Sequence, residues 1–318
     1  MKQALAQALA RRRQALPEGT TCWRWVDDEV PGVTVDRFGE VAIVALYQDA
    51  TEAFERELAE HLMSLEPLRA VYVKRRPREA RKTANEAPEQ VAPSRPVAGE
   101  PVEALVATER GLRFEIRPAN GLSVGLYLDA RDARAWVRSV AAGRRVLNTF
   151  AYTCGFGVAA QVGGAARVAN VDRSRKVLDW GAQNLSLNGG SPQRYDFIAS
   201  DTFEWLRRLT KKGERFDLVV LDPPGFATFE GQRFSAQRDY HLLVRAAAPV
   251  LAPGGLLLAM CNVEAMSPRD FDGHCERGLA EVSARRVTSF GASGIDYRVP
   301  SALKCSVFEL GESKRRTA

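Results

Sequence analysis

The stretch RVLNTFAYTCGFGVAA, residues 145–160, decides the fold of this chain of 318 residues. Its apolar run at residues 146–150 leads into a turn of small residues that contains Gly155 and Gly157. Residues 158–160 then open a helical segment. A strand, a small-residue turn and a helix in this order are typical of α/β sheets that bind ligands at the carboxyl ends of their strands. The stretch therefore predicts the first strand of such a sheet.

Further apolar runs follow this strand along the chain. They lie at residues 168–171, 197–199, 218–221 and 256–260, with amphipathic segments between them. This alternation predicts a βαβ series and a mostly parallel sheet. No repeat with a period of about 20–50 residues is visible, which argues against a solenoid.

Carboxylates follow three of these runs. Asp172 stands about twenty residues beyond the glycines, where an acid can accept hydrogen bonds from a ribose diol. Asp201 follows the third run, and Asp222 opens the segment DPPGF. Each acid alone is also an ordinary helix cap, but all three stand at one edge of the predicted sheet. A nicotinamide site fits poorly, because Ala160 replaces the third glycine of GxGxxG and the DPPGF segment has no ready role in hydride transfer.

The amino-terminal part of the chain predicts a smaller α+β unit. Residues 1–19 predict a basic helix, and residues 20–116 predict a strand-rich domain. Within that domain, residues 77–101 are rich in proline and charge, and we expect a mobile arm there. Residues 117–311 would then form the sheet domain, and residues 312–318 a basic tail.

Composition limits the partners and the compartment. The 45 Lys and Arg residues exceed the 39 Asp and Glu residues, so the net charge of +6 permits a polyanionic partner. Five cysteines without a CxxC pair and only three histidines argue against a structural zinc site, and we expect no bound metal. The chain has no run that is apolar enough to span a membrane and no signal peptide at its start. We therefore expect a cytoplasmic protein with free thiols.

With these motifs the chain resembles the class I S-adenosylmethionine-dependent methyltransferases, and specifically the bacterial large-subunit ribosomal RNA methyltransferase family that includes 5-methylcytosine and 7-methylguanine enzymes. The resemblance rests on residues 148–157 and 222–226, on PGVTVDRFG at 31–39 and on GLYLDARDAR at 125–134. It implies a Rossmann-like methyltransferase domain, preceded by a small α+β domain of RNA-binding type and lacking the PUA domain with which many relatives begin. The implied cofactor is S-adenosyl-L-methionine and the implied partner is large-subunit ribosomal RNA, bound by a monomer or a homodimer.

The resemblance also implies the residues that hold the cofactor. Asp172 would bind the ribose, Asp201 would lie near the adenine, and Asp222 with Pro223 would lie at the transferable methyl group. The remaining residues that it implies around the cofactor are Phe150, Tyr152, Gly155, Arg173, Thr202 and Arg131.

Three alternatives remain open for the activity. In the first, which the position of Cys261 at the end of the fifth run favours, a Cys261 thiolate adds to carbon 6 of cytosine, Asp222 positions the base and carbon 5 is methylated. In the second, Asn262 and the loop from Asp222 to Phe226 hold a guanine, Phe226 stacks on the flipped base, and no thiol is needed. In the third, the chain is a catalytically silent RNA-binding scaffold, because Cys154 replaces a glycine of the family turn.

Overall fold

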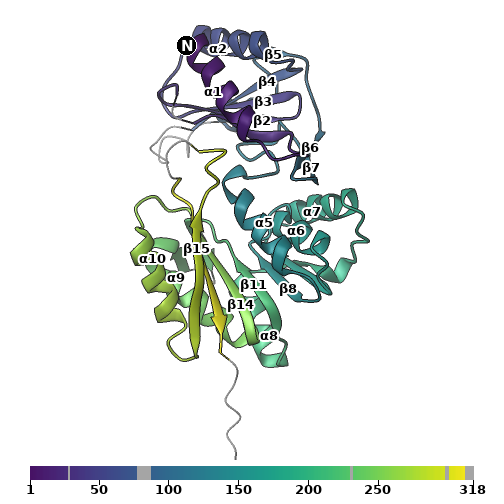
Figure 1. Cartoon of the computed structure of the whole chain (residues 1–318), viewed down its shortest axis with the longest axis vertical. Helices are drawn as coiled ribbons and strands as arrows, with labels where there is room; N and C mark the ends of the chain where they lie inside the picture. Colours follow the sequence, from purple (N-terminus) through teal and green to yellow (C-terminus); the bar gives the residue numbers. More distant parts are fainter. Residues whose placement is uncertain (28, 77–86, 230–231, 298–300, 312–318) are drawn as a thin grey trace, which may run out of the picture. The chain divides into compact units, whose positions relative to one another are not determined.

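The computed structural model describes residues 1–27, 29–76, 87–229, 232–297 and 301–311 (Figure 1). The chain forms two compact units. The first comprises Met1–Arg131 and Ser293–Pro300, and the second comprises Asp132–Ala292 and Ser301–Ala318. The boundary thus falls after Arg131 and not after residue 116, and the first unit also includes a segment from late in the chain.

A five-stranded sheet forms the centre of the first unit. Its order is β1 (Cys22–Val26), β2 (Val33–Phe38), β3 (Val41–Leu46), β4 (Ala70–Arg75) and β5 (Ala98–Gly99). Only β3 and β4 are parallel neighbours, because helix α2 (Glu52–Leu65) makes the crossover between them. Strands β6 (Leu105–Glu109) and β7 (Leu112–Ile116) form a separate hairpin, and the turn η1 (Leu128–Ala130) follows.

The basic amino-terminal helix packs on this sheet. Helix α1 (Lys2–Ala15) buries Leu5 and Leu9 in the same apolar core as Trp25. The indole Nε1 of Trp25 donates a hydrogen bond of 2.9 Å to the backbone oxygen of Leu5. The helix is therefore part of the first unit.

The proline-rich region contains regular structure where it is described. Helix α4 (Pro88–Val91) and strand β5 lie within the predicted arm, and β5 pairs with β4 through Gly99 and Ala98. Residues 77–86 of that arm lie outside the described residues, as does the predicted basic tail at 312–318.

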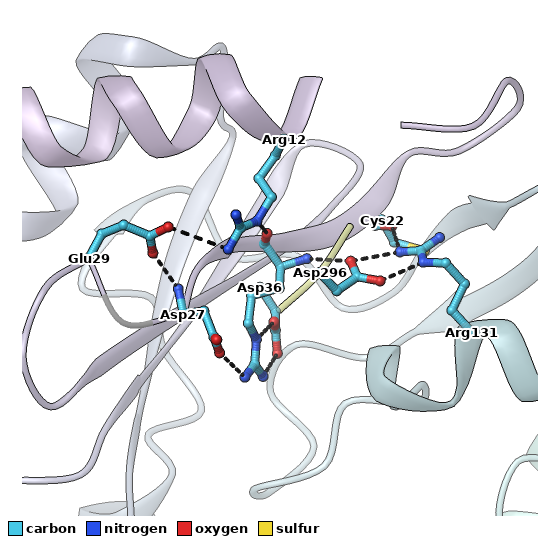
Figure 2. Close-up of polar contacts among 8 residues, drawn as sticks. Arg12, Cys22, Asp27, Glu29, Asp36, Arg131 and Asp296 are labelled. Carbon is cyan, nitrogen blue, oxygen red and sulfur yellow. Dashed lines mark hydrogen bonds and ion pairs between the residues drawn. The ribbon is translucent and has the colours of Figure 1, made fainter. Parts of the chain in front are cut away.

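Buried charges of the first unit pair with one another, as Figure 2 shows. The Arg131 Nε atom lies 2.6 Å from Asp296 Oδ2, and both side chains are fully buried. Arg131 Nη2 also donates to the backbone oxygen of Cys22 at 2.7 Å, and the Arg24 amide donates to Asp296 Oδ1 at 3.0 Å. These contacts attach the segment around Asp296 to β1, which explains why Ser293–Pro300 belongs to the first unit.

The second unit contains the predicted mostly parallel sheet. Its seven strands stand in the order β10 (Phe197–Ala199), β9 (Arg167–Asp172), β8 (Arg145–Thr149), β11 (Phe216–Leu221), β14 (Leu251–Cys261), β16 (Lys304–Leu310) and β15 (Ala284–Gly291). The first five are parallel, and β16 is antiparallel to both of its neighbours. The strand order reverses beside β8, which is the switch point where doubly wound sheets bind ligands. The Rossmann-like fold class is confirmed.

Helices connect and cover these strands (Figure 1). They are α5 (Arg131–Val140), α6 (Gly155–Val162), α7 (Arg175–Leu187), α8 (Thr202–Lys212), α9 (Ala236–Ala247) and α10 (Pro268–Gly278), with the short turns η2 (Arg194–Asp196) and η3 (Ala248–Val250). A hairpin of β12 (Phe226–Phe229) and β13 (Gln232–Ser235) separates β11 from α9. In one core cluster Leu221 and Ala259 of the sheet pack with Tyr240 of α9 and Phe271 of α10. No helix in the described part of the chain is long and apolar enough to cross a membrane.

Candidate active site

The turn after β8 has an unusual backbone. Phe150, Tyr152 and Cys154 have φ values of 53°, 49° and 61°, in the left-handed region that residues other than glycine rarely adopt. Each such residue costs about 1–3 kcal/mol, and strain of this kind gathers at functional sites. The turn ends at Gly155, where α6 begins with backbone N–H groups that have no partner inside the helix. The geometry supports a site for an anionic or polar ligand group at this end of β8.

Asp172 connects this turn to the end of β9. Its Oδ2 accepts a hydrogen bond from the Tyr152 amide and its Oδ1 accepts one from the Ser174 amide, both at 2.9 Å. A carboxylate offers about four acceptor positions, so two further hydrogen bonds remain possible. The half-buried side chain can therefore hold the turn and a vicinal diol at the same time.

The next strand end carries Asp201 and Thr202. Asp201 caps helix α8, because its Oδ1 accepts from the amides of Phe203 at 2.9 Å and Glu204 at 3.3 Å. Thr202 is buried at the first position of the helix. The ordinary capping role of Asp201 is thus confirmed, and it uses one of the two carboxylate oxygens.

The DPPGF segment follows β11 at the same edge. Asp222 is half-buried and Pro223 is buried, whereas 78% of the Phe226 side chain is exposed. Below them, the buried hydroxyl of Tyr240 lies 3.2 Å from the Leu221 oxygen and 2.8 Å from the Met260 oxygen. Tyr240 thus joins the ends of β11 and β14 from inside the core.

Cys261 ends β14 with its side chain in the apolar core. The residue is 1% exposed, and its Sγ lies 3.8 Å from the Sδ of Met266. Burial raises the pKa of the Cys261 thiol, although a backbone hydrogen bond from Val263 and the charge of Lys304 oppose this effect. A raised pKa favours the neutral thiol over the nucleophilic thiolate. Asn262, the next residue, is exposed.

Cys154 is also buried. Its pKa is raised well above the usual value by burial and by the nearby charge of Asp172. A Cβ atom placed on Gly181 of α7 would lie 2.3 Å from the Cys154 Sγ, so this glycine makes room for the sulfur. Cys154 is therefore a packing residue of the turn.

The side chain of one predicted cofactor residue is held by partners in the first unit. Arg131 belongs to the first unit, and its guanidinium is held by Asp296 and by the Cys22 backbone. Arg131 is therefore not among the site residues proposed below, and its role at the cofactor stays a prediction from the sequence. The residues that follow the carboxyl ends of neighbouring strands in the second unit are Phe150, Tyr152, Gly155, Asp172, Arg173, Asp201, Thr202, Asp222, Pro223, Phe226, Cys261 and Asn262.

A layer of buried amides supports the turn, and sequence reasoning missed it. Asn148 Nδ2 donates to Asn170 Oδ1 at 2.9 Å, and Asn184 Nδ2 donates to the Thr153 oxygen at 3.0 Å. A Cβ atom on Gly157 would lie 2.2 Å from the same Asn170 oxygen, which explains the glycine at this position. The signal was present in the sequence, because asparagines interrupt two otherwise apolar strands.

The donor set at this edge fits a nucleoside cofactor that carries a charged amino acid moiety. Two carboxylates with spare acceptor positions suit a ribose diol and an adenine amine, and the amides at the start of α6 suit a carboxylate. Among the described residues no group of three or more His, Cys, Asp or Glu side chains is arranged to hold a metal ion.

Comparison with known proteins agrees with the type of cofactor that this donor set fits. Residues 14–286 match the family model described as S-adenosylmethionine-dependent methyltransferase. Proteins named ribosomal RNA large subunit methyltransferase I are similar: that of Klebsiella pneumoniae (strain 342) is 37% identical over 232 residues, which are 73% of this chain and 57% of that protein. That of Aeromonas salmonicida (strain A449) is 38% identical over 233 residues, with the same two shares. The chain thus spans somewhat more than half the length of these relatives.

Solved structures show the same fold. A protein from Streptococcus mutans, proposed to be a SAM-dependent methyltransferase, has a TM-score of 0.84 at 23% identity, over 97% of this chain and 80% of that one. The tRNA m1G37 methyltransferase of M. jannaschii has a TM-score of 0.60 at 16% identity, over 90% and 78% of the two chains.

Proposed function

Because the chain belongs to the S-adenosylmethionine-dependent methyltransferase family, we propose that it transfers a methyl group from S-adenosylmethionine to a base of large-subunit ribosomal RNA. The observation that carries the proposal is the set of half-buried carboxylates, Asp172, Asp201 and Asp222, which follow the carboxyl ends of three parallel strands of the second sheet. The likeness to ribosomal RNA methyltransferases over 73% of the chain supports the choice of substrate. The net charge of +6 agrees with a polyanionic partner.

Different site residues contact different parts of the cofactor in this proposal. Asp172 accepts hydrogen bonds from the ribose diol, and Asp201 with Thr202 lies beside the adenine. Phe150, Tyr152 and Gly155 surround the amino acid moiety, and Arg173 follows the ribose-binding acid. When bound, S-adenosylmethionine supplies an electrophilic methyl group on a sulfonium.

Asp222 and Pro223 lie next to the reacting atoms in this proposal. The Asp222 carboxylate accepts a hydrogen bond from an amine of the target base, and the buried Pro223 excludes water beside it. The exposed ring of Phe226 stacks on the flipped base, and the exposed amide of Asn262 reads its edge. Holding the base against the methyl donor supplies the orientation on which the transfer depends.

Among the alternatives, the side chains favour a guanine nitrogen as the acceptor. A guanine nitrogen attacks the methyl group with its own lone pair and needs no enzyme nucleophile. Cytosine carbon 5 requires a thiolate, and the 1% exposure and raised pKa of Cys261 disfavour one. The role of Cys261 as nucleophile stays a prediction from the sequence, and the guanine mechanism is our proposal.

The deciding experiment is methyl transfer from labelled S-adenosylmethionine to unmodified ribosomal RNA, followed by nucleoside digestion and mass analysis. Wild type is compared with Cys261→Ala and with Cys275→Ala, a buried cysteine of α10 that controls for lost packing. We expect labelled methylguanosine, retained in both variants. Labelled 5-methylcytidine that disappears only in Cys261→Ala would establish the thiol mechanism instead.

The same experiment tests the silent scaffold. Calorimetric titration of the protein with S-adenosylmethionine accompanies it, and we expect saturable binding. Binding of RNA without binding of the cofactor, and with no label transferred, would reject the proposed activity.

A further inference from the structure

A pocket of about 420 Å³ lies between α9 and α10 of the second unit, two helices that run beside each other in Figure 1. The cofactor residues proposed above do not line it. Its lining residues are Gln237, Ala265, Met266, Arg269, Asp270, Gly273, His274 and Arg277. The volume lies within the usual range of ligand sites, about 300–1,000 Å³.

Basic groups dominate the side chains around this pocket. Arg269 and Arg277 are exposed, and within the described part of the chain neither forms an ion pair. Asp270 is the one acid in the lining, and its Oδ2 accepts a hydrogen bond from Ser267 Oγ at 2.7 Å. With the neutral amide of Gln237, the pocket presents two guanidinium groups against one carboxylate.

The first turns of two helices contribute to the pocket, whereas Arg277 lies in the last turn of α10. Gln237 lies in the first turn of α9, and Arg269 and Asp270 lie in the first turn of α10. The positive ends of helix dipoles favour an anion at such a place. Arginine forks bind phosphate oxygens through paired hydrogen bonds, so the two features favour the same chemistry.

His274 is an independent indication of a ligand. Its side chain lines the pocket, is 8% exposed, and has an Nδ1 atom with no hydrogen-bond partner among the described residues. The ring lies 5.5 Å from that of His241, measured between centroids. A buried polar nitrogen without a partner is costly, and an oxygen of a ligand would satisfy it.

The pocket lies close to the proposed base-binding residues. Ala265 follows Asn262 by three residues, so their Cα atoms are at most about 11 Å apart. Gln237 follows Ser235 by two residues, and Ser235 is the strand partner of Phe226, which limits that separation to about 13 Å. An RNA strand that places a base on Phe226 can therefore bring a flanking phosphate to the pocket.

We infer that the α9/α10 pocket binds a backbone phosphate of the RNA next to the target base, through Arg269, Arg277, Gln237 and His274. This inference rests on the proposed function, because it takes the substrate RNA as the source of the phosphate. The pocket would fix the position of the strand without reading its sequence, as phosphate contacts do.

RNA binding by charge-matched variants provides the first test. We would measure the Kd of a fluorescein-labelled single-stranded oligoribonucleotide by anisotropy for wild type, for Arg269→Gln/Arg277→Gln and for Lys211→Gln/Arg245→Gln. The control residues are exposed, lie on α8 and α9 outside the pocket lining, and give the same change in charge. We expect about tenfold weaker binding and a salt slope reduced by roughly 1 for the pocket variant only. Equal losses in the two double variants would overturn the inference.

A steric variant removes the site without changing its charge. A Cβ atom on Gly273 meets only Arg277 Nη1, at 3.7 Å, so the helix accepts a side chain here. We expect Gly273→Leu to fill the pocket and to weaken RNA binding as the double variant does, while Gly273→Ala leaves it within about twofold of wild type. Unchanged RNA binding in a folded Gly273→Leu protein would also overturn the inference.

Histidine NMR distinguishes RNA from inorganic phosphate as the ligand of the pocket. The chain has three histidines, so the ring signals of His274 can be assigned by substitution. We expect the oligoribonucleotide to shift them in wild type but not in Arg269→Gln/Arg277→Gln. A shift with inorganic phosphate at constant ionic strength but none with RNA would overturn the RNA source and leave a small-anion site. If the RNA shifts His274 while no RNA is methylated, the proposed function fails and the phosphate site stands.

Discussion

The two units of this protein use charged side chains in different ways. In the first unit, Arg131 and Asp296 are fully buried and pair through two hydrogen bonds, and the buried Glu109 lies 3.7 Å from the same guanidinium. In the second unit, Asp172 and Asp201 are only half-buried at strand ends, and each uses part of its carboxylate to hold backbone amides. A charge that is satisfied inside the protein indicates structure, whereas a carboxylate with spare acceptor positions at a sheet edge indicates a ligand.

Replacing Arg131 by leucine tests the structural half of this comparison and has the largest expected effect. Arg131→Leu leaves Asp296 buried without its counterion, which should lower the free energy of unfolding by about 3–5 kcal/mol. Urea denaturation measures the loss. Arg131→Leu/Asp296→Leu removes both members of the pair and should recover part of the loss, because the buried Glu109 still lacks the guanidinium 3.7 Å away. A stable single variant with weakened S-adenosylmethionine binding would instead return Arg131 to the cofactor site.

Replacing Asp172 tests whether the half-buried carboxylates of the second unit bind a ligand. Asp172→Ala should raise the Kd for S-adenosylmethionine about 10- to 100-fold, because the charge-assisted hydrogen bonds to the ribose and the anchor of Tyr152 are both lost. Isothermal titration calorimetry measures this change. Thr51→Ala is the control, because it removes a helix cap of the first unit and should lose about 1 kcal/mol of stability with cofactor affinity unchanged. Similar cofactor affinity in wild type and Asp172→Ala would contradict the assignment.

Replacing Phe226 tests whether an exposed side chain at the site serves the ligand and not the fold, because its ring contributes little to packing. Phe226→Ala should lower kcat/KM for RNA methylation about 10- to 100-fold through lost base stacking, with Tm unchanged. Tyr195→Ala, which removes an aromatic ring that is 67% exposed, should leave both quantities unchanged. A loss of Tm in Phe226→Ala would assign the residue to packing.

The smallest expected effect concerns the pH dependence of stability through His274. Its pKa is lowered by burial, by the charge of Arg277 and by the neighbouring His241 ring, while Asp270 and a hydrogen bond with the Gln237 backbone oppose this effect. The unfolded chain therefore binds a proton more readily, so this contribution is present above pH 6.5 and is lost as the pH falls through the folded pKa. Chemical denaturation from pH 5 to 8 should show a shallower acid loss for His274→Asn than for wild type. Identical profiles would show that His274 titrates normally.

Local patterns in the sequence were sufficient to predict the fold of the second unit and its family, both of which are confirmed. Apolar runs predicted the five parallel strands, and the parallel order placed Asp172, Asp201 and Asp222 at one edge. Strands β15 and β16 were not predicted, because their pairing with β14 depends on contacts distant in sequence.

Three predicted site residues show where sequence reasoning reaches its limit. The motif around Arg131 matched the family, but a motif does not reveal that Asp296 occupies the guanidinium. Cys261 is the last residue of β14, a strand that is buried on both faces near its end, and Asn262 is the first residue beyond it, so the exposure of each depends on where the strand ends, which the sequence leaves open.

The contact between Cys154 and Gly181 has an evolutionary consequence. With cysteine at 154, any side chain at 181 would collide with the sulfur, because its Cβ would lie 2.3 Å from Sγ. A glycine at 154 would remove the sulfur and Cβ contacts, and the closest remaining atom to a Cβ at 181 would be the Thr153 carbonyl carbon at 3.2 Å, which a small shift can accommodate. Among homologues the two positions should therefore covary, with alanine or larger residues at 181 found only in chains that carry glycine at 154.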